Sequence, residues 1–130
     1  MSLHSAAKSN NLAAAQEALA SGAEVDGQDR SGRSPLHVSA AAGNVGIIKM
    51  LLERDADVDL EDNDGDTALH LAAAGGHAEC CQVLMEKSDV DAENADTGNT
   101  PIFSAVKGGH IEAVTVLVQG GADVNLPCED

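Results

Sequence analysis

The segment Gly32-Arg-Ser-Pro-Leu-His-Val-Ser-Ala-Ala-Ala-Gly43 decides the fold, because variants of it recur along the chain at a period of 33 residues. The period divides the 130 residues into units 1–31, 32–64, 65–97 and 98–130. A fixed period of this length is typical of solenoids, in which each unit packs against its neighbours. We therefore expect a single domain of four repeats. The columns are Leu3, Leu36, Leu69 and Ile102; His4, His37, His70 and Phe103; Ala7, Ala40, Ala73 and Val106; Asn10, Gly43, Gly76 and Gly109; and Ala18, Leu51, Leu84 and Leu117.

The start of each later repeat predicts the first turn of a helix. Ser34, Thr67 and Thr100 suit the N-cap, because a hydroxyl can accept a hydrogen bond from a free backbone N–H. Pro35 and Pro101 follow at the first helical position, where no N–H is needed.

The second repeat shows the rest of the pattern. An Ala-rich helix is expected over 36–42 and a second helix over 45–54, whose apolar residues recur at three- and four-residue spacing. The Asp-rich stretch 55–64 predicts an extended turn or hairpin. The fold class is therefore an all-α solenoid of stacked helix-turn-helix repeats. The apolar face of the second helix is made by Ile47, Ile48, Leu51 and Leu52.

Three segments resemble the signature of the ankyrin-repeat family: Ser34-Pro-Leu-His37, Thr67-Ala-Leu-His70 and Thr100-Pro-Ile-Phe103. The pairs Gly76-His77 and Gly109-His110 and the segments 56–59 and 122–125 resemble it too, so that the likeness covers essentially the whole chain. It implies antiparallel helix pairs and β-hairpin fingers that project at right angles. It also implies a concave surface, made of finger tips and first helices, that binds other proteins.

The composition excludes several classes of function. The chain has 7 Lys and Arg against 22 Asp and Glu, a formal net charge of −15 that repels nucleic acid and anionic lipid. Phe103 is its one aromatic residue, which excludes base-stacking platforms and aromatic cages. No apolar run approaches the roughly 20 residues of a membrane span, and the start lacks the features of a signal peptide. Three Cys make a poor disulfide framework, so we expect the cytoplasm, the nucleus or both.

No residues form the pattern of a catalytic, cofactor or metal site. Equivalent residues of stacked repeats lie about 10 Å apart, so His4, His37 and His70 cannot converge on one ion. The resemblance instead assigns these His to hydrogen bonds that brace adjoining turns. Cys80 and Cys81 share columns with core Ile residues and are expected to be buried, although a redox pair is the alternative.

Two further features lead to no site. Asp62-Asn-Asp-Gly-Asp66 resembles part of a calcium loop, but Leu60 and Leu71 stand where that loop requires acids. Cys128 lies in the tail and is expected to be exposed and incidental. The chain is therefore expected to be a non-catalytic protein–protein interaction module. The alternatives are a regulatory or inhibitory subunit of an enzyme, and an enzyme in its own right, which no motif supports.

The charge is concentrated in the fingers, which hold 15 of the 22 acids, and those at 55–66 and 88–99 contain no Lys or Arg. This indicates either a solvated face that keeps the protein soluble or an acidic groove that attracts a basic partner segment. The family's contact positions, carried over column by column, give candidate partner-binding residues. They are Arg30, Ser31, Arg33, Asn63, Asp64, Asp66, Asp96, Thr97 and Asn99 on the fingers, and Lys8, Ser9, Ala41, Ala42, Ala74 and Lys107 on the first helices.

Four departures from the repeat are also informative. Asp55 stands where other repeats have Gly, which is unfavourable if the backbone there is left-handed. The finger of the third repeat is one residue longer and should be reshaped. Arg33 shares a column with Asp66, so these two are expected to bridge neighbouring fingers, and Phe103 removes whatever hydrogen bond the signature His makes.

The fourth repeat resembles an internal one, whereas terminal repeats normally have a polar outer face. We expect an exposed apolar strip there, available for self-association or for a partner. The residues concerned are Ile111, Val114, Val116, Leu117 and Val118.

Overall fold

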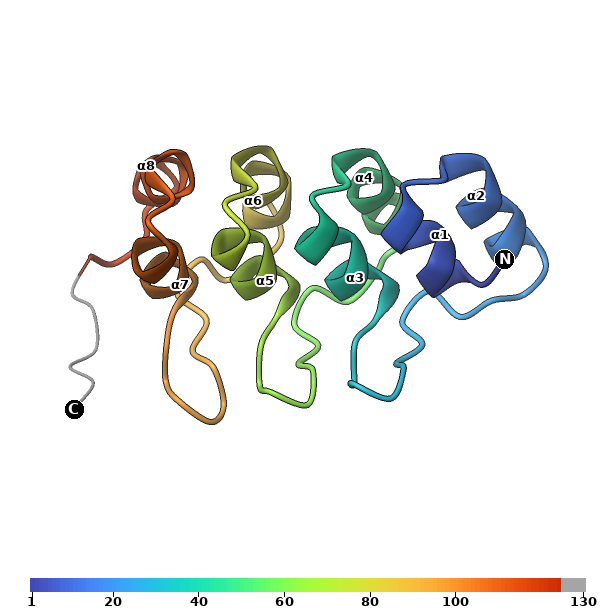
Figure 1. The fold of residues 1–130 in the computed structure, drawn as a ribbon, viewed down its shortest axis with the longest axis horizontal. Coiled ribbons are helices and arrows are strands. Elements are labelled where there is room, and N and C mark those ends of the chain that lie inside the picture. Colours follow the sequence, from blue (N-terminus) through green and yellow to red (C-terminus); the bar gives the residue numbers. More distant parts are fainter. Residues whose placement is uncertain (125–130) are drawn as a thin grey trace.

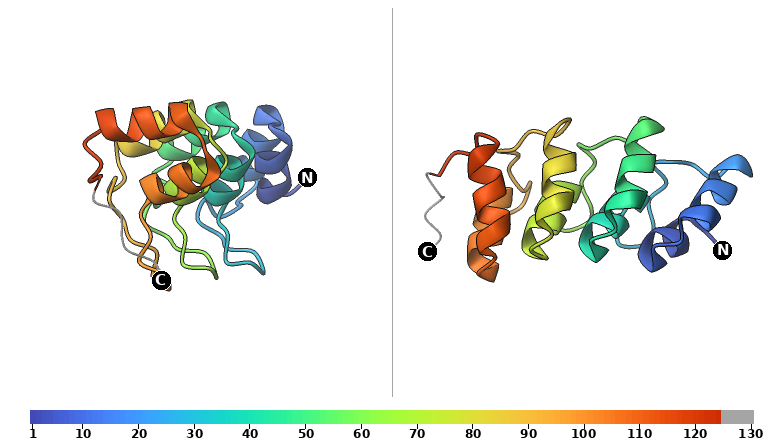
Figure 2. Two further views of the ribbon diagram at one scale, coloured as in Figure 1. Left: turned by 60° about the vertical axis from the view of Figure 1, so that its left-hand side comes forward. Right: turned by 90° about the horizontal axis from the view of Figure 1, so that it is seen from above.

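The computed structural model describes residues 1–124, which form eight α-helices in four pairs (Figure 1). The first helices of the pairs form one layer and the second helices form another (Figure 1). Seen from above, the pairs follow one another in a row (Figure 2). The predicted all-α solenoid is confirmed. The helices are α1 (Leu3–Ser9), α2 (Leu12–Ala20), α3 (Pro35–Ala42), α4 (Val45–Glu53), α5 (Ala68–Ala74), α6 (Ala78–Met85), α7 (Pro101–Gly108) and α8 (Ile111–Gln119).

The predicted N-caps begin the first helices. The Ser34 hydroxyl accepts a hydrogen bond from the His37 backbone N–H, and the Thr67 hydroxyl accepts one from that of His70. Thr100 has the same extended backbone but makes no side-chain cap bond. The backbone position of the cap is therefore common to these repeats, whereas the side-chain bond forms in the two that carry His three positions later.

The second helices bury the predicted apolar face. Ile47, Ile48 and Leu51 have no exposed surface, and Cys80 and Cys81 occupy the same columns of α6 within the core. The core interpretation of the two cysteines is confirmed. Burial of each such aliphatic side chain stabilises the fold by about 1.5–3 kcal/mol.

The connections after α2, α4 and α6 project to one side as fingers (Figure 1). Within residues 1–124 they contain no β-strand, so the expected hairpins are turns closed by side-chain and backbone hydrogen bonds. In the second finger, Asp62 Oδ1 accepts from the N–H groups of Asp64 and Asp66, each at 3.0 Å. The Asp62 N–H donates to the Asp66 carbonyl at 2.9 Å. A carboxylate that binds two backbone N–H groups fixes this turn without a strand ladder.

The third finger has a different shape, as its extra residue predicts. Asn94 takes the part of Asp62, but its N–H donates to the carbonyl of Asn99, five residues on rather than four. Its Oδ1 accepts from the N–H groups of Asp96 and Thr97 at 2.7 and 3.0 Å.

Asp55 is in the left-handed region, with φ 62°, and the equivalent Gly22 and Gly121 also have positive φ. The expectation that this position needs a left-handed backbone is confirmed. Because a Cβ is unfavourable there, Asp55 costs on the order of 1 kcal/mol relative to Gly.

Candidate protein-binding surface

Buried histidines tie α3 and α5 to the following finger, and half-buried His4 ties α1 in the same way, with its Nε2 2.9 Å from the Arg33 carbonyl oxygen. His37 Nε2 lies 2.9 Å from the Asp66 carbonyl oxygen, and His70 Nε2 lies 2.8 Å from that of Asn99. A carbonyl oxygen only accepts, so each Nε2 carries the proton and donates. The bracing role implied by the family resemblance is confirmed for His4, His37 and His70.

The other ring nitrogen of His37 is an acceptor. Its Nδ1 receives the N–H of Ser34 at 3.2 Å and the Ser34 hydroxyl at 2.8 Å. Protonation of Nδ1 would place two donors against each other. Burial lowers the pKa of His37 below its usual value, against an opposing effect of the hydrogen bond to Asp66. The ring therefore stays neutral, and it contributes both to the helix cap and to the bond with the next finger.

The fourth repeat lacks this arrangement, as the Phe103 substitution predicts. Phe103 has no polar atom, and Thr100 Oγ1 is buried without a hydrogen-bond partner within the described part of the chain. An unpaired buried hydroxyl costs about 1–3 kcal/mol. Phe103 is half-buried and faces a groove instead.

We call this hollow the finger groove. It has a volume of about 490 Å³ and lies between the second and third fingers, the end of α5 and the outer side of α7. Two of its carboxylates, Asp64 and Asp96, are exposed, and neither takes part in an ion pair within residues 1–124. Lys107 is the one cation that lines it. The groove is lined by Asp64, Asp66, Ala74, Asn94, Asp96, Thr97, Asn99, Phe103, Ser104 and Lys107.

The structure brings seven of the candidate residues together in this groove: Asp64, Asp66, Ala74, Asp96, Thr97, Asn99 and Lys107. The others lie outside it, towards the first repeat. Arg30, Ser31 and Asn63 are exposed on the first two fingers, and Ala41 and Ala42 lie at the end of α3. Lys8 and Ser9 are exposed at the end of α1.

The sequence reasoning missed three groove residues, Asn94, Phe103 and Ser104. Phe103 could have been identified from the sequence. It stands in a column of His residues that are buried and hydrogen-bonded, and an apolar ring without those hydrogen bonds is not held in the same place. Asn94 was hidden by the longer finger, which moves the turn-forming residue out of the column of Asp62.

The expected bridge between Arg33 and Asp66 is not the one that forms. Arg33 Nε lies 3.5 Å from Asp62 Oδ2, whereas Asp66 Oδ1 accepts a hydrogen bond of 2.6 Å from Asn94 Nδ2. The Asp62 side chain is almost fully buried and its Oδ1 binds the turn, so Oδ2 is left as the oxygen that faces Arg33. Column position alone does not reveal which acid closes the turn.

Hydrogen bonds between adjacent fingers fix their spacing. Asn63 donates to the carbonyls of both Ser31, from its backbone at 2.9 Å, and Arg30, from its side chain at 2.8 Å. Asn94 Nδ2 donates to the Asp64 carbonyl at 2.9 Å in the same way. The exposed carboxylates therefore project from turns that hydrogen bonds join to one another.

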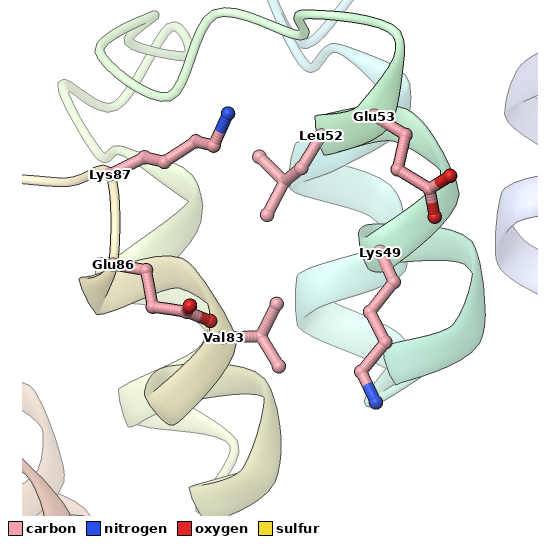
Figure 3. A pocket seen from close by; sticks show the side chains of 6 residues that line it. All are labelled: Lys49, Leu52, Glu53, Val83, Glu86 and Lys87. Carbon is pink, nitrogen blue, oxygen red and sulfur yellow. The ribbon is translucent and has the colours of Figure 1, made fainter.

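A second hollow, on the side of the second helices, differs in charge (Figure 3). It has a volume of about 310 Å³, and Leu52 and Val83 form its apolar part. Lys49 and Glu53 line it from α4, and it is also lined by Glu86, the C-cap of α6, and by Lys87, the residue after it (Figure 3). Positive and negative charges balance here, whereas acids outnumber cations in the finger groove.

The two buried cysteines are protonated thiols. Burial raises the pKa of Cys80 to about 11 and of Cys81 to about 12, so both thiols stay protonated at neutral pH and are poor nucleophiles. No group of three or more His, Cys, Asp or Glu within residues 1–124 is placed to hold a metal ion. None of the helices in that range is both long and apolar enough to cross a membrane. Cys128 lies outside the described residues.

Comparison with models of known protein families identifies the family of this chain. Two family models, described as ankyrin repeats in three copies and in many copies, match residues 54–128 and 3–52 respectively. A search of the curated proteins gives no match. The matched ranges include all residues of the eight helices except Glu53, and the chain belongs to the ankyrin-repeat family.

Proposed function

We propose that the finger groove binds a basic segment of a partner protein. Ankyrin repeats are generally protein–protein interaction modules and are typically non-catalytic. The observation that carries the finer proposal is the charge of the groove: Asp64, Asp66 and Asp96 lie in one hollow with Lys107 as its one cation. Carboxylates gathered in a concave site focus the field and attract cations.

The carboxylates differ in how free they are to bind. Asp66 is already engaged with Asn94, whereas Asp64 and Asp96 contribute only backbone atoms to the turn contacts described above. Their side chains are exposed. Asp64 and Asp96 are therefore the pair that would meet a partner's cations.

Phe103 favours arginine over lysine in the partner. A guanidinium stacks on an aromatic ring while its N–H groups bind carboxylates, a combination that the compact lysine ammonium matches less well. Phe103 lines the groove together with Asp64 and Asp96. We expect the replacement Phe103→Leu to weaken an arginine-containing peptide by a few-fold and a lysine-containing one by less, since a cation–π contact at an exposed site contributes about 0.5–1 kcal/mol.

The test is a calorimetric titration of an arginine-rich peptide into the wild type and into a variant with Asp64→Lys and Asp96→Lys. We expect affinity to fall by about tenfold or more in the variant, and to fall with rising salt in the wild type. The matched control carries Glu79→Lys and Glu112→Lys, an equal charge change on exposed residues between α6 and α8. Equal losses in both variants would show bulk charge rather than a site, and no loss in either would refute the proposal.

Further hypotheses about function accompany this proposal. A partner that is an enzyme would make the chain a regulatory or inhibitory subunit, which an activity assay of the captured partner distinguishes from simple binding.

We also propose the exposed apolar side of the last repeat as a second contact surface. We propose the cytoplasm or the nucleus as the place of action, where buried free thiols such as Cys80 and Cys81 stay reduced.

A further inference from the structure

The fourth repeat exposes only part of the expected apolar strip. Ile111 is 80% and Val118 is 45% exposed, whereas Val114 and Val116 are half-buried and Leu117 is buried. Ile111 stands at the first position of α8 and is the most exposed large apolar side chain of residues 1–124. It is therefore the residue of the strip that gains most from being covered by another molecule.

Ile111 lines a hollow of about 490 Å³ on the side of the second helices. The hollow lies between α6 and α8, which are neighbours in their layer (Figure 1). We call it the α6–α8 groove. Ala78 and Val116, both half-buried, complete its apolar part. Two adjacent helices therefore contribute apolar surface to one concave site.

The exposure of Ile111 is not simply a consequence of its place in the last described repeat. The groove lies on the side of α8 that faces α6, so the preceding repeat forms its other wall. Leu12 occupies the same column of α2 and is still 43% exposed, although α4 packs against α2. Val45 and Ala78 in this column are half-buried. Stacking of repeats therefore covers an apolar side chain at this position only in part.

Two carboxylates share the groove with Ile111. Glu79 and Glu112 occupy the same column of α6 and α8, both are exposed, and neither takes part in an ion pair within residues 1–124. The other polar residues that line the groove, Gln82 and Thr115, are uncharged, so that no cation of the described residues lines it. A carboxylate in the first turn also stabilises its helix, but this accounts for neither the hollow nor the exposed Ile111.

The combination of acidic and apolar surface is absent from the equivalent place one repeat earlier. Between α4 and α6, Gly46 stands in the column of Glu79 and Lys49 in that of Gln82. One carboxylate is missing there, and a neutral amide is replaced by a cation. A basic ligand is therefore attracted to the α6–α8 groove more than to its counterpart.

The spacing of the two carboxylates fits a helix that lies across α6 and α8. Packed helices are about 8–10 Å apart. Residues seven positions apart on one face of a helix are separated by about 10.5 Å, at a rise of 1.5 Å per residue. Cations at positions i and i+7 of a partner helix can therefore meet Glu79 and Glu112 together. A large apolar side chain at i+4 lies on the same face and can cover Ile111.

We propose that the α6–α8 groove binds a basic amphipathic helix of a partner protein, with a large apolar side chain on Ile111 and a cation on each of Glu79 and Glu112. This goes beyond the function proposed for the finger groove, because the site lies in the layer of second helices and not on the fingers (Figure 1). The apolar anchor supplies most of the affinity. An arginine-rich peptide without a large apolar side chain lacks that anchor, so its binding is confined to the finger groove.

Fluorescence anisotropy with labelled, Ala-rich helical peptides tests the proposal. The first peptide has Lys at positions i and i+7 and Leu at i+4, and the second has Ala in place of Leu, with the same charge. We expect the wild type to bind the Leu peptide about tenfold more tightly than the Ala peptide, because one more aliphatic side chain is buried. Ile111→Ala should abolish most of this preference. Since Ile111 is 80% exposed, the variant should fold, which circular dichroism checks.

The matched control is Leu12→Ala, which removes an exposed apolar side chain from the same column of α2, where Ala13 stands in the column of Glu112. It should leave the preference for the Leu peptide unchanged. A wild type without that preference, a preference that survives Ile111→Ala, or an equal loss in Leu12→Ala would each overturn the proposal. A peptide with Leu moved to the opposite helix face should bind no better than the Ala peptide, and equally tight binding would exclude the helical occupant.

The carboxylates are tested separately from the anchor. Glu79→Gln together with Glu112→Gln should weaken both peptides by a few-fold and reduce the salt dependence of binding, and unchanged affinity would overturn the pairing with cations. Asp64→Lys together with Asp96→Lys should leave the preference for the Leu peptide intact. A preference lost in that variant but kept in Ile111→Ala would move the site to the finger groove, so that failure of this proposal is distinguishable from failure of the other.

Discussion

The third and fourth repeats begin their first helices with the same backbone but different chemistry. In the third, Thr67 and His70 form a reciprocal cap, and His70 reaches on to the carbonyl of Asn99. In the fourth, the Thr100 hydroxyl has no hydrogen-bond partner among residues 1–124, and Phe103 makes neither bond. One substitution thus removes a cap and a brace, and it turns an internal structural position into part of a groove surface.

This difference separates the residues that hold the solenoid from those proposed to bind. The first three repeats carry the histidine braces, and hydrogen bonds join their fingers. The fourth contributes Phe103 and Lys107 to the finger groove and its valines to the surface. Exchanging features between the two repeats tests that separation.

The largest effect is expected when the third repeat is given the residue of the fourth. His70→Phe removes the partner of the Thr67 hydroxyl and the donor to the Asn99 carbonyl at a fully buried position. Three polar groups lose a hydrogen bond, namely the Thr67 N–H, the Thr67 hydroxyl and the Asn99 carbonyl, so the free energy of unfolding should fall by about 3 kcal/mol. Urea denaturation measures it, and a loss below about 1 kcal/mol would contradict the bracing role.

A smaller effect, opposite in the two repeats, is expected from removing the cap hydroxyls. Thr67→Val deletes both bonds with His70 and should cost about 1–2 kcal/mol. Thr100→Val deletes a buried hydroxyl without a partner and should be neutral or stabilising by up to about 1 kcal/mol. Parallel urea curves compare them, and equal losses would show that the two caps are equivalent after all.

The reverse exchange, Phe103→His, should recover only part of what His70→Phe loses. The new Nδ1 can accept from the Thr100 hydroxyl, but within residues 1–124 no finger follows whose carbonyl could receive Nε2. The gain from the cap, about 1 kcal/mol, is offset by lost apolar contact of the ring. Thermal denaturation should show a midpoint within a few degrees of the wild type, whereas a large gain would mean that a second partner exists.

The smallest effect on stability is expected from acidification, because His37 can gain a proton whereas Phe103 cannot. The folded pKa of His37 is lowered, so the unfolded chain binds a proton first as the pH falls. The stability contributed by this residue is full above its unfolded pKa of about 6.5 and is lost as the pH falls from there towards the folded pKa. Urea midpoints between pH 7.5 and pH 5 should decline, and the decline should shrink in His37→Gln; an unchanged slope in that variant would assign the effect to other groups.

The sequence alone predicted the repeat, the helix pairs and the caps, because each depends on local spacing. Ser34, Thr67 and Thr100 all begin helices, and Ile47, Ile48, Cys80 and Cys81 lie in the core as their columns require. Much of the groove could likewise be anticipated, since finger tips and first helices recur in register.

What the sequence did not reveal depends on geometry inside the fingers. The partner of Arg33 is Asp62 rather than Asp66, because the turn engages one oxygen of Asp62 and leaves the other facing the arginine. The extra residue of the third finger moved Asn94 out of register, and so its contacts with Asp64 and Asp66 were not foreseen.

The most direct test of the proposed binding surface is residue-resolved mapping of a bound basic peptide. Adding an arginine-rich peptide to isotopically labelled protein should shift the amide resonances of Asp64, Asp96, Phe103 and Lys107 in two-dimensional nitrogen–proton NMR spectra. Those of Glu79, Glu112 and Lys49 on the second helices should stay unchanged. Shifts centred on the second helices, or spread evenly over all acidic residues, would contradict the claim that the finger groove is the binding site.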